Sequence, residues 1–161
     1  MIKVGIAPYL ECSSRGNKCF SAFYARIKKR NNSSIEEIYQ ASKVFEDGST
    51  NLNIAEARGK VAINQEECSL LYSMLWEEYI AENPDLIEIL INATGLSDMY
   101  GQEGHCCQAL ELWRIRNNFI EIKSLSDDML KAAESSMGFW DNEEDETWDE
   151  SFVPATNWGT K

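Results

Sequence analysis

The sequence lacks the features that mark several common classes of protein. No apolar run approaches the roughly 20 residues that a helix needs to cross a bilayer. There is neither a G-x-x-x-x-G-K-[ST] phosphate loop nor a G-x-G-x-x-G sequence after an expected strand. The first residues also lack the long apolar segment of a signal peptide. These absences argue against membrane insertion, P-loop chemistry and Rossmann-type dinucleotide binding. They predict a cytoplasmic protein, in a bacterium or in a phage-infected host cell.

Histidine and paired cysteines are also scarce. The single histidine, His105, would have to serve any Ser-His or Cys-His catalysis, and the spacing supplies no partner for it. The five cysteines are odd in number and include no C-x-x-C pair. His105, Cys106 and Cys107 are adjacent, so on a helix their side chains point in different directions. We therefore expect free thiols, with no metal site, no disulfide framework and no cofactor.

Positive charge is in short supply, since the formal net charge is −12. This balance argues against loose, charge-driven binding to nucleic acid. Seven acidic residues and no basic ones lie between Asp141 and Glu150, within a segment, 138–161, that also contains tryptophans. We expect this segment to be a flexible tail that docks on its own domain or on a protein partner. A basic cluster suits a phosphate-bearing ligand or is a solvated loop, and it comprises Arg15, Lys18, Arg26, Lys28, Lys29 and Arg30.

Apolar periodicity predicts a mainly α-helical domain with a few short β-strands, an α+β fold formed by residues 1–137 as a single domain. The clearest helix spans 66–81, where apolar residues recur at helical spacing. Further expected helices are Ser34–Lys43, 54–59, 85–93, 106–117 and one that begins at Ser126; expected strands are 2–7 and 119–123; 19–27 is a buried segment and 96–104 a loop.

The expected helix Ser34–Lys43 carries the most informative pattern. Its apolar residues, among them Ile35 and Ile38, share one side and can face a core. On the other side a carboxylate, a phenol, an amide and an amine form one stripe, made of Glu36, Tyr39, Gln40 and Lys43. Such a stripe is either a solvated helix face or the wall of a polar ligand site.

Several short motifs resemble those of the NADAR (YbiA-like) family, small and mainly helical domains associated with NAD and ADP-ribose metabolism. The resemblance covers about residues 19–117, in the same order and at plausible spacings. It rests on Phe20-Ser21-x-Phe23, Glu36-x-x-Tyr39-Gln40-Ala41-x-Lys43, Ala55-x-x-x-Gly59, Asn83-Pro84-x-Leu86 running into Ala93-Thr94-Gly95, and the glycine loop and helix from Gly104 to Arg116.

The resemblance implies hydrolysis of an N-glycosidic bond, such as removal of ADP-ribose from guanine or cleavage of a ribosylamine. It makes Glu36 and Lys43 the catalytic pair, because a carboxylate can stabilise the sugar cation or move a proton and a desolvated amine can attack C1. Asp98 is a second acid/base candidate or a turn-capping residue. Basic residues near Arg26 and Lys28, or Arg58 and Lys60, could hold a pyrophosphate. The expected substrate-binding residues are Phe20, Ser21, Phe23, Tyr39, Gln40, Arg58, Gly59, Tyr100, Gly101, Gly104 and His105.

The chain departs from the family pattern at several of these motifs. Ala22 and Cys106 stand where the family has asparagine, Glu37 where it often has histidine, and Ala109 where it has glycine. Retention of Glu36 and Lys43 favours an enzyme that acts on an ADP-ribose-containing nucleotide or a modified nucleic-acid base. The departures favour a non-catalytic protein that sequesters such a nucleotide or takes part in DNA base modification. A third hypothesis is an acidic interaction protein that acts through residues 138–161.

Overall fold

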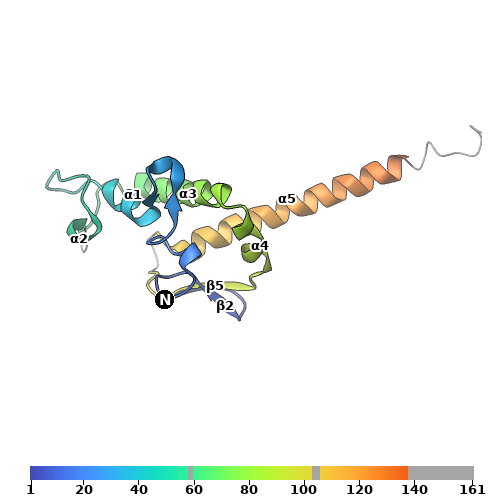
Figure 1. The fold of residues 1–161 in the computed structure, drawn as a ribbon, viewed down its shortest axis with the longest axis horizontal. Helices are drawn as coiled ribbons and strands as arrows, with labels where there is room; N and C mark the ends of the chain where they lie inside the picture. The colour runs from blue at the N-terminus through green and yellow to red at the C-terminus, as the bar shows by residue number, and fades with distance from the viewer. Residues whose placement is uncertain (58–59, 103–105, 138–161) are drawn as a thin grey trace, which may run out of the picture. The chain divides into compact units, whose positions relative to one another are not determined.

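The computed structural model describes residues 1–57, 60–102 and 106–137 (Figure 1). The chain divides into two units, Met1–Glu121 and Ile122–Lys161. All but one of the helices and all of the strands that the model describes lie within the first unit, and α5 begins there. The predicted tail, 138–161, lies outside the described residues, so its role remains a prediction.

A three-stranded sheet has the last of its strands in sequence at its centre. The central strand, β5, pairs antiparallel with β1 and parallel with β2. Leu96 of β5 is the partner of both Val4 and Leu10 in the register. A side chain at Gly95 would meet the Ile6 carbonyl oxygen at 2.6 Å, so this close approach of the strands requires glycine. The strands are β1 (Ile2–Gly5), β2 (Tyr9–Glu11) and β5 (Gly95–Asp98).

The central strand corrects the expectation of a loop over 96–104. Residues 95–98 are all buried and paired on both sides, although four residues with one glycine give no strand-like pattern of their own. The strand exists because β1 and β2, about 90 residues earlier in the chain, supply both sets of hydrogen-bond partners. The strand predicted at 2–7 is confirmed, with an earlier end at Gly5.

Helix α3 (Gln65–Glu82) confirms the amphipathic helix predicted at 66–81. Its apolar face supplies much of the core, including Leu75 and Trp76, neither of which is exposed to solvent. Helix α4 (Asp85–Asn92) confirms the next prediction, since Leu90 is buried and Leu86 packs against the core. Ile89, on the same side, is 45% exposed, and Ile87 packs against the core as well. Both helices therefore follow from local periodicity.

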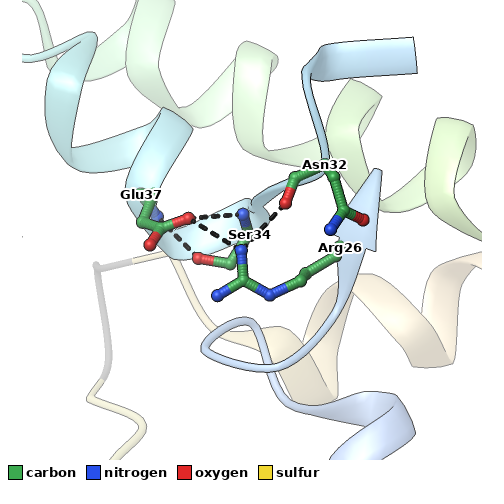
Figure 2. Close-up of polar contacts among 4 residues, drawn as sticks. All are labelled: Arg26, Asn32, Ser34 and Glu37. Atoms are coloured by element: carbon green, nitrogen blue, oxygen red, sulfur yellow. Dashed lines mark hydrogen bonds and ion pairs between the residues drawn. The ribbon is translucent and has the colours of Figure 1, made fainter. Parts of the chain in front are cut away.

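Helix α1 (Ile35–Ala41) begins after the predicted N-cap, Ser34, but ends before the predicted limit, so Lys43 lies two residues beyond the helix. The Glu37 backbone N–H donates to the Ser34 hydroxyl at 3.1 Å, and the Ser34 N–H donates to the Glu37 carboxylate at 2.7 Å. This capping box pairs two backbone donors that the first turn would otherwise leave free. Arg26 donates to the same carboxylate and to the Asn32 carbonyl, which ties the helix start to the preceding hairpin (Figure 2).

Two short strands and two 3-10 turns lead into α1, where the sequence indicated a buried segment over 19–27. Within it Phe20, Ala25 and Ile27 are buried while Phe23 and Tyr24 are exposed, so the burial prediction holds for only part of the segment. The elements are η1 (Lys18–Phe20), β3 (Arg26–Ile27), η2 (Lys28–Arg30) and β4 (Ser33–Ser34), and β3 pairs antiparallel with β4.

Helix α5 (Gln108–Met137) replaces three predicted elements with one. The strand expected at 119–123 and the separate helix expected from Ser126 are wrong, because the helix runs through both segments. Adjacent apolar residues at 119 and 120 fit a strand as well as a helix when read locally. The first turns pack through Ala109, Leu112 and Ile115, whereas Leu110, expected on the packed side, is 43% exposed.

The described residues thus form a mainly helical α+β structure, as the sequence predicted. One further short helix, α2 (Ile54–Ala57), confirms the helix expected from residue 54. In the parts of the chain that the model describes, every helix is too short or too polar to span a membrane. The more specific YbiA-like fold stays a prediction.

Candidate functional site

A cavity of about 280 Å³ opens beside α1 in the first unit. One wall is α1, which presents its polar stripe. Another consists of the end of β5 and the turn that follows it, and the remainder comes from α3, the start of α5 and two earlier turns. The lining residues are Ser14, Phe23, Glu36, Tyr39, Gln40, Lys43, Tyr72, Asp98, Tyr100, Gly101, Gln102, Cys106 and Gln108.

The structure brings together many, but not all, of the residues singled out in the sequence. All three catalytic candidates line this cavity, and so do five of the expected binding residues: Phe23, Tyr39, Gln40, Tyr100 and Gly101. Phe20 and Ser21 do not, because both are completely buried, Phe20 within the hydrophobic core. Arg58, Gly59, Gly104 and His105 lie outside the described residues.

The Phe20–Phe23 motif acts through the backbone. The carbonyl oxygen of Ala22 accepts a hydrogen bond of 3.0 Å from the Glu36 N–H, and that of Ala25 accepts one of 2.9 Å from the Ile35 N–H. These bonds pair two further donors of the first turn of α1. The Ala22 N–H donates in turn to the Gln108 side chain at 2.9 Å. The turn therefore sets where Glu36 stands and joins α1 to the start of α5.

Glu36 is held in a partly buried, polar setting. Burial raises the pKa of its carboxyl group above the usual range, and the charge of Asp98 acts in the same direction. A hydrogen bond of 2.7 Å from the Gln40 amide and the charge of Lys43 oppose this rise without cancelling it. A carboxyl group with a raised pKa can keep its proton closer to neutral pH and act as an acid.

Gln40 leaves one polar atom free in the cavity wall. Its Nε2 donates to Glu36, while its Oε1 is buried and has no hydrogen-bond partner among the described residues. A buried acceptor without a partner is costly, because it has lost water without gaining a donor. This atom can accept an N–H or O–H from a ligand.

Aromatic rings form the next part of the wall. The Lys43 ammonium lies 4.4 Å from the centroid of the Tyr39 ring, a cation–π contact. Tyr39 meets the ring of Tyr72 edge to face at 5.0 Å. Burial is the largest cause that raises the pKa of Tyr39, and the neighbouring Cys106 is the next, so the Tyr39 hydroxyl stays protonated. The amine of Lys43 is thus placed over an apolar surface two turns from Glu36.

Asp98 caps a turn, one of the two roles considered in the sequence, and its side chain lines the cavity. It is 5% exposed at the end of β5, where it caps a turn by accepting the Tyr100 N–H at 3.0 Å. Its other oxygen accepts a hydrogen bond from the Cys107 thiol at 3.5 Å. Burial is the main cause that raises the pKa of that thiol to about 11, and the charge of Asp98 adds to it. A side chain at Gly101 would meet the Cys107 sulfur at 2.9 Å, so glycine lets this turn close against α5. The carboxylate is therefore fixed at the cavity by bonds on both oxygens.

Sequence reasoning did not assign five of the lining residues to the site: Ser14, Tyr72, Gln102, Cys106 and Gln108. Tyr72 belongs to the apolar face of the helix expected over 66–81, and Cys106 stands where the resembling family has asparagine. A polar-tipped ring on the apolar face of α3 was the available signal for Tyr72. The sequence held no comparable signal for Ser14, which reaches the cavity only through the folding of the β2–η1 turn.

Of the residues proposed to hold a pyrophosphate, the three that the structure describes, Arg26, Lys28 and Lys60, do not line this cavity. Arg26 is engaged with Glu37 and the Asn32 carbonyl. Lys60 pairs with Asp47 at 3.2 Å and lines a neighbouring cavity of about 90 Å³, which shares Tyr39, Lys43 and Cys106 with the larger one. Among the described residues, no group of three or more histidine, cysteine or acidic side chains is arranged to hold a metal ion.

The comparisons with known proteins leave the family open. No protein-family model, curated protein or solved structure matches the chain.

Proposed function

We propose that the protein is an N-glycosidase that cleaves the bond between ribose and a base in an ADP-ribosylated or ribosylated substrate. One observation carries the proposal: Glu36, Lys43 and Asp98 line the same cavity. The motif resemblance to the NADAR family motivates the choice of reaction. ADP-ribosyl-guanine in DNA, or a related nucleotide, is the substrate class that we infer.

Departure of the base requires a proton. When the bond to C1 of the ribose breaks, the base takes both electrons and positive charge develops on the sugar. Glu36 is suited to give its proton to the departing base, because burial favours its protonated form. Once ionised, the same carboxylate stabilises the sugar cation. Gln40 holds the carboxyl group in place and offers Oε1 to a donor on the substrate.

Lys43 supplies the nucleophile in this proposal. Its neutral amine forms a bond to C1 as the base leaves. Opening of the ribose ring gives an imine, and water hydrolyses this imine, which releases the sugar as ADP-ribose or ribose and restores the amine. The ammonium must lose a proton before it attacks. The carboxylates of Glu36 and Asp98 line the same cavity and are the available acceptors. Asp98 is the acceptor left for this proton while Glu36 acts as the acid, and hydrogen bonds to both of its oxygens hold it in place.

The test is release of ADP-ribose from an ADP-ribosylated guanine oligonucleotide. We expect turnover by the wild type and a loss of about a thousandfold or more in Lys43→Ala, because the nucleophile is gone. Lys29→Ala is the matched control, since Lys29 is exposed and does not line the cavity. Reduction with cyanoborohydride during turnover should add the mass of the sugar adduct to the wild type and not to Lys43→Ala. Turnover by Lys43→Ala at the wild-type rate would refute the mechanism.

A second candidate is a binding protein that sequesters an ADP-ribose-like nucleotide without turnover. It is favoured by Cys106, which places a thiol in the cavity at the position where the resembling family has an amide. Tight binding of ADP-ribose with no release of product from any ribosylated base would select this candidate. Cys106→Asn would then be the variant in which to look for gained activity.

A further inference from the structure

Arg15 differs from the other arginines that the structure describes. Arg26, Arg30 and Arg114 each pair with a carboxylate, and the Arg116 guanidinium donates to three backbone carbonyls. Within residues 1–57, 60–102 and 106–137, the guanidinium of Arg15 is the one with no hydrogen bond or ion pair. It lies 5.9 Å from the centroid of the Tyr100 ring, which lines the cavity. Arg15 is thus an exposed cation at the outer limit of cation–π range from an aromatic ring, with its donors available.

The backbone around Arg15 is fixed by a tight turn. The Gly16 N–H donates to the Ser13 carbonyl at 2.9 Å, and the Asn17 N–H donates to the Glu11 carbonyl at 2.8 Å. The residue before Arg15, Ser14, lines the cavity. An arginine held on such a turn loses less conformational freedom on binding than one on a loose loop.

Glu11 joins this turn to the one that carries Tyr100. Its carboxylate accepts from the Ser13 N–H at 3.0 Å on one side, and from the Ser97 hydroxyl at 2.7 Å and the Met99 N–H at 3.0 Å on the other. The carboxylate of Glu11 therefore fixes the two turns that carry Arg15 and Tyr100 relative to each other. The arrangement is built before any ligand arrives.

We propose that Arg15, with Ser14 and the Tyr100 ring, forms an anion subsite at the rim of the cavity, which binds a phosphate or diphosphate group of the ligand. The choice of a phosphate-bearing nucleotide as ligand rests on the proposed function. Guanidinium groups bind phosphate through paired N–H donors, and Arg15 has these donors free. The cavity itself holds the carboxyl groups of Glu36 and Asp98 and the single amine of Lys43, so a second cation at the rim adds to the attraction for an anion.

The subsite also orients the substrate. A diphosphate at Arg15 places the sugar that follows it deeper in the cavity, toward Glu36 and Lys43. A ribosylated base without phosphates would lose this anchor and bind more weakly, although the reacting groups would be unchanged. The protein should therefore prefer a nucleotide to the corresponding nucleoside.

The experiment measures binding of ADP-ribose, inorganic pyrophosphate and adenosine by calorimetry, at low and at physiological salt. We expect Arg15→Gln to weaken the binding of ADP-ribose and of pyrophosphate by about tenfold, the effect of one charge-assisted contact at a solvated site. The affinity for adenosine should stay unchanged. Arg15→Lys should recover part of the loss, because it keeps the charge without the planar fork. Lys29→Gln is the matched control from the same basic cluster, because Lys29 is exposed and does not line the cavity. The salt dependence of binding should be smaller in Arg15→Gln.

The outcomes separate the subsite from the proposed function. Equal binding of ADP-ribose by Arg15→Gln and wild type overturns the subsite and leaves the Lys43 test standing. An equal loss in Lys29→Gln also overturns it, since general charge would then explain the effect. Arg15-dependent binding of pyrophosphate without release of ADP-ribose from any substrate supports the subsite and overturns the enzyme. Failure of the wild type to bind any of the anions overturns the subsite. A melting curve shows whether Arg15→Gln is folded.

Discussion

The two main walls of the cavity are built in opposite ways. The α1 wall is local: Ser34 and Glu37 cap the helix, and Gln40 reaches Glu36 one turn away. The β5 wall depends on distant segments, since Ser97 and Met99 are held by Glu11, 86 and 88 residues earlier in the chain. Its catalytic candidate, Asp98, stands at the end of a strand that has neighbours on both sides.

This difference predicts how each wall responds to substitution. Changes at the cap or at Glu36 of α1 should alter the cavity with a small loss of stability, because they leave its core residue, Ile35, in place. Changes in β5 should destabilise the first unit, because the strand is also part of its core. Four substitutions test this comparison, and they are considered from the largest expected effect to the smallest.

Leu96→Ala should have the largest effect. Leu96 is fully buried at the centre of the sheet, so truncation leaves a cavity and should cost about 3 kcal/mol of unfolding free energy. Urea denaturation of the full chain measures the change. Leu70→Ala in α3 is the control, because Leu70 is 65% exposed and its truncation should cost little. Similar losses for the two variants would mean that the β5 wall is not a core element.

Glu11→Ala should cost about 2 kcal/mol, because it leaves the Ser13 and Met99 N–H groups and the Ser97 hydroxyl without their acceptor. Partial burial acts to raise the pKa of Glu11, but the hydrogen bonds from Ser97, Ser13 and Met99 outweigh it and lower the pKa. The stability that Glu11 provides is therefore present above the ordinary glutamate pKa and is lost as the pH falls through the lowered one.

The measurement for Glu11 is the gap in stability between wild type and Glu11→Ala as a function of pH. The gap should narrow in acid. Glu66→Ala, at an exposed position in the first turn of α3, should show no comparable gap. A gap for Glu11→Ala that is constant down to strongly acidic pH would contradict the lowered pKa.

Ser34→Ala should cost about 1 kcal/mol, the usual effect of removing an N-cap hydroxyl. The Glu37 N–H loses its acceptor, and the first turn of α1, which carries Glu36, becomes easier to open. Hydrogen exchange of the first-turn amides should rise more than that of β5. Ser73→Ala within α3 is the control, since a mid-helix serine gains helix propensity on replacement. Faster exchange in β5 than in α1 would contradict the local character of this wall.

Glu36→Gln should have the smallest effect and the opposite sign. Burial raises the folded-state pKa of Glu36, so ionisation costs stability above that pKa and costs nothing below the ordinary glutamate value. Removal of the charge should therefore raise the melting temperature slightly near neutral pH and leave it unchanged in acid. The same variant should lose activity if Glu36 supplies the proton. Destabilisation at neutral pH would show that the ionised carboxylate is a net stabilising group.

Local sequence signals were sufficient for α1 and α3. Both helices show apolar residues at helical spacing, and Ser34 precedes the first of them as an N-cap. The polar stripe that pointed to a ligand site is also local, and its members do line a cavity. They could be named from the sequence because residues three and four apart on a helix share a face whatever packs around it.

Other features could not be predicted because their causes are distant in the chain. β5 is a strand only because β1 and β2 pair with it, and α5 continues where a strand and a new helix fitted equally well. Phe20 and Ser21 lie next to cavity residues in sequence but turn into the core. Among the basic cluster, only the folded chain separates Arg15, whose donors are free, from Arg26 and Arg30, which are paired.

The sequence by itself determined the mainly helical class, the helix α1 and the polar face made by Glu36, Tyr39 and Gln40, because these depend on backbone periodicity and capping over a few residues. Only the tertiary structure decided that Asp98 and Tyr100 stand beside that face. Strand pairing and the bonds of Glu11 join segments almost 90 residues apart, and no local pattern encodes which of them will meet.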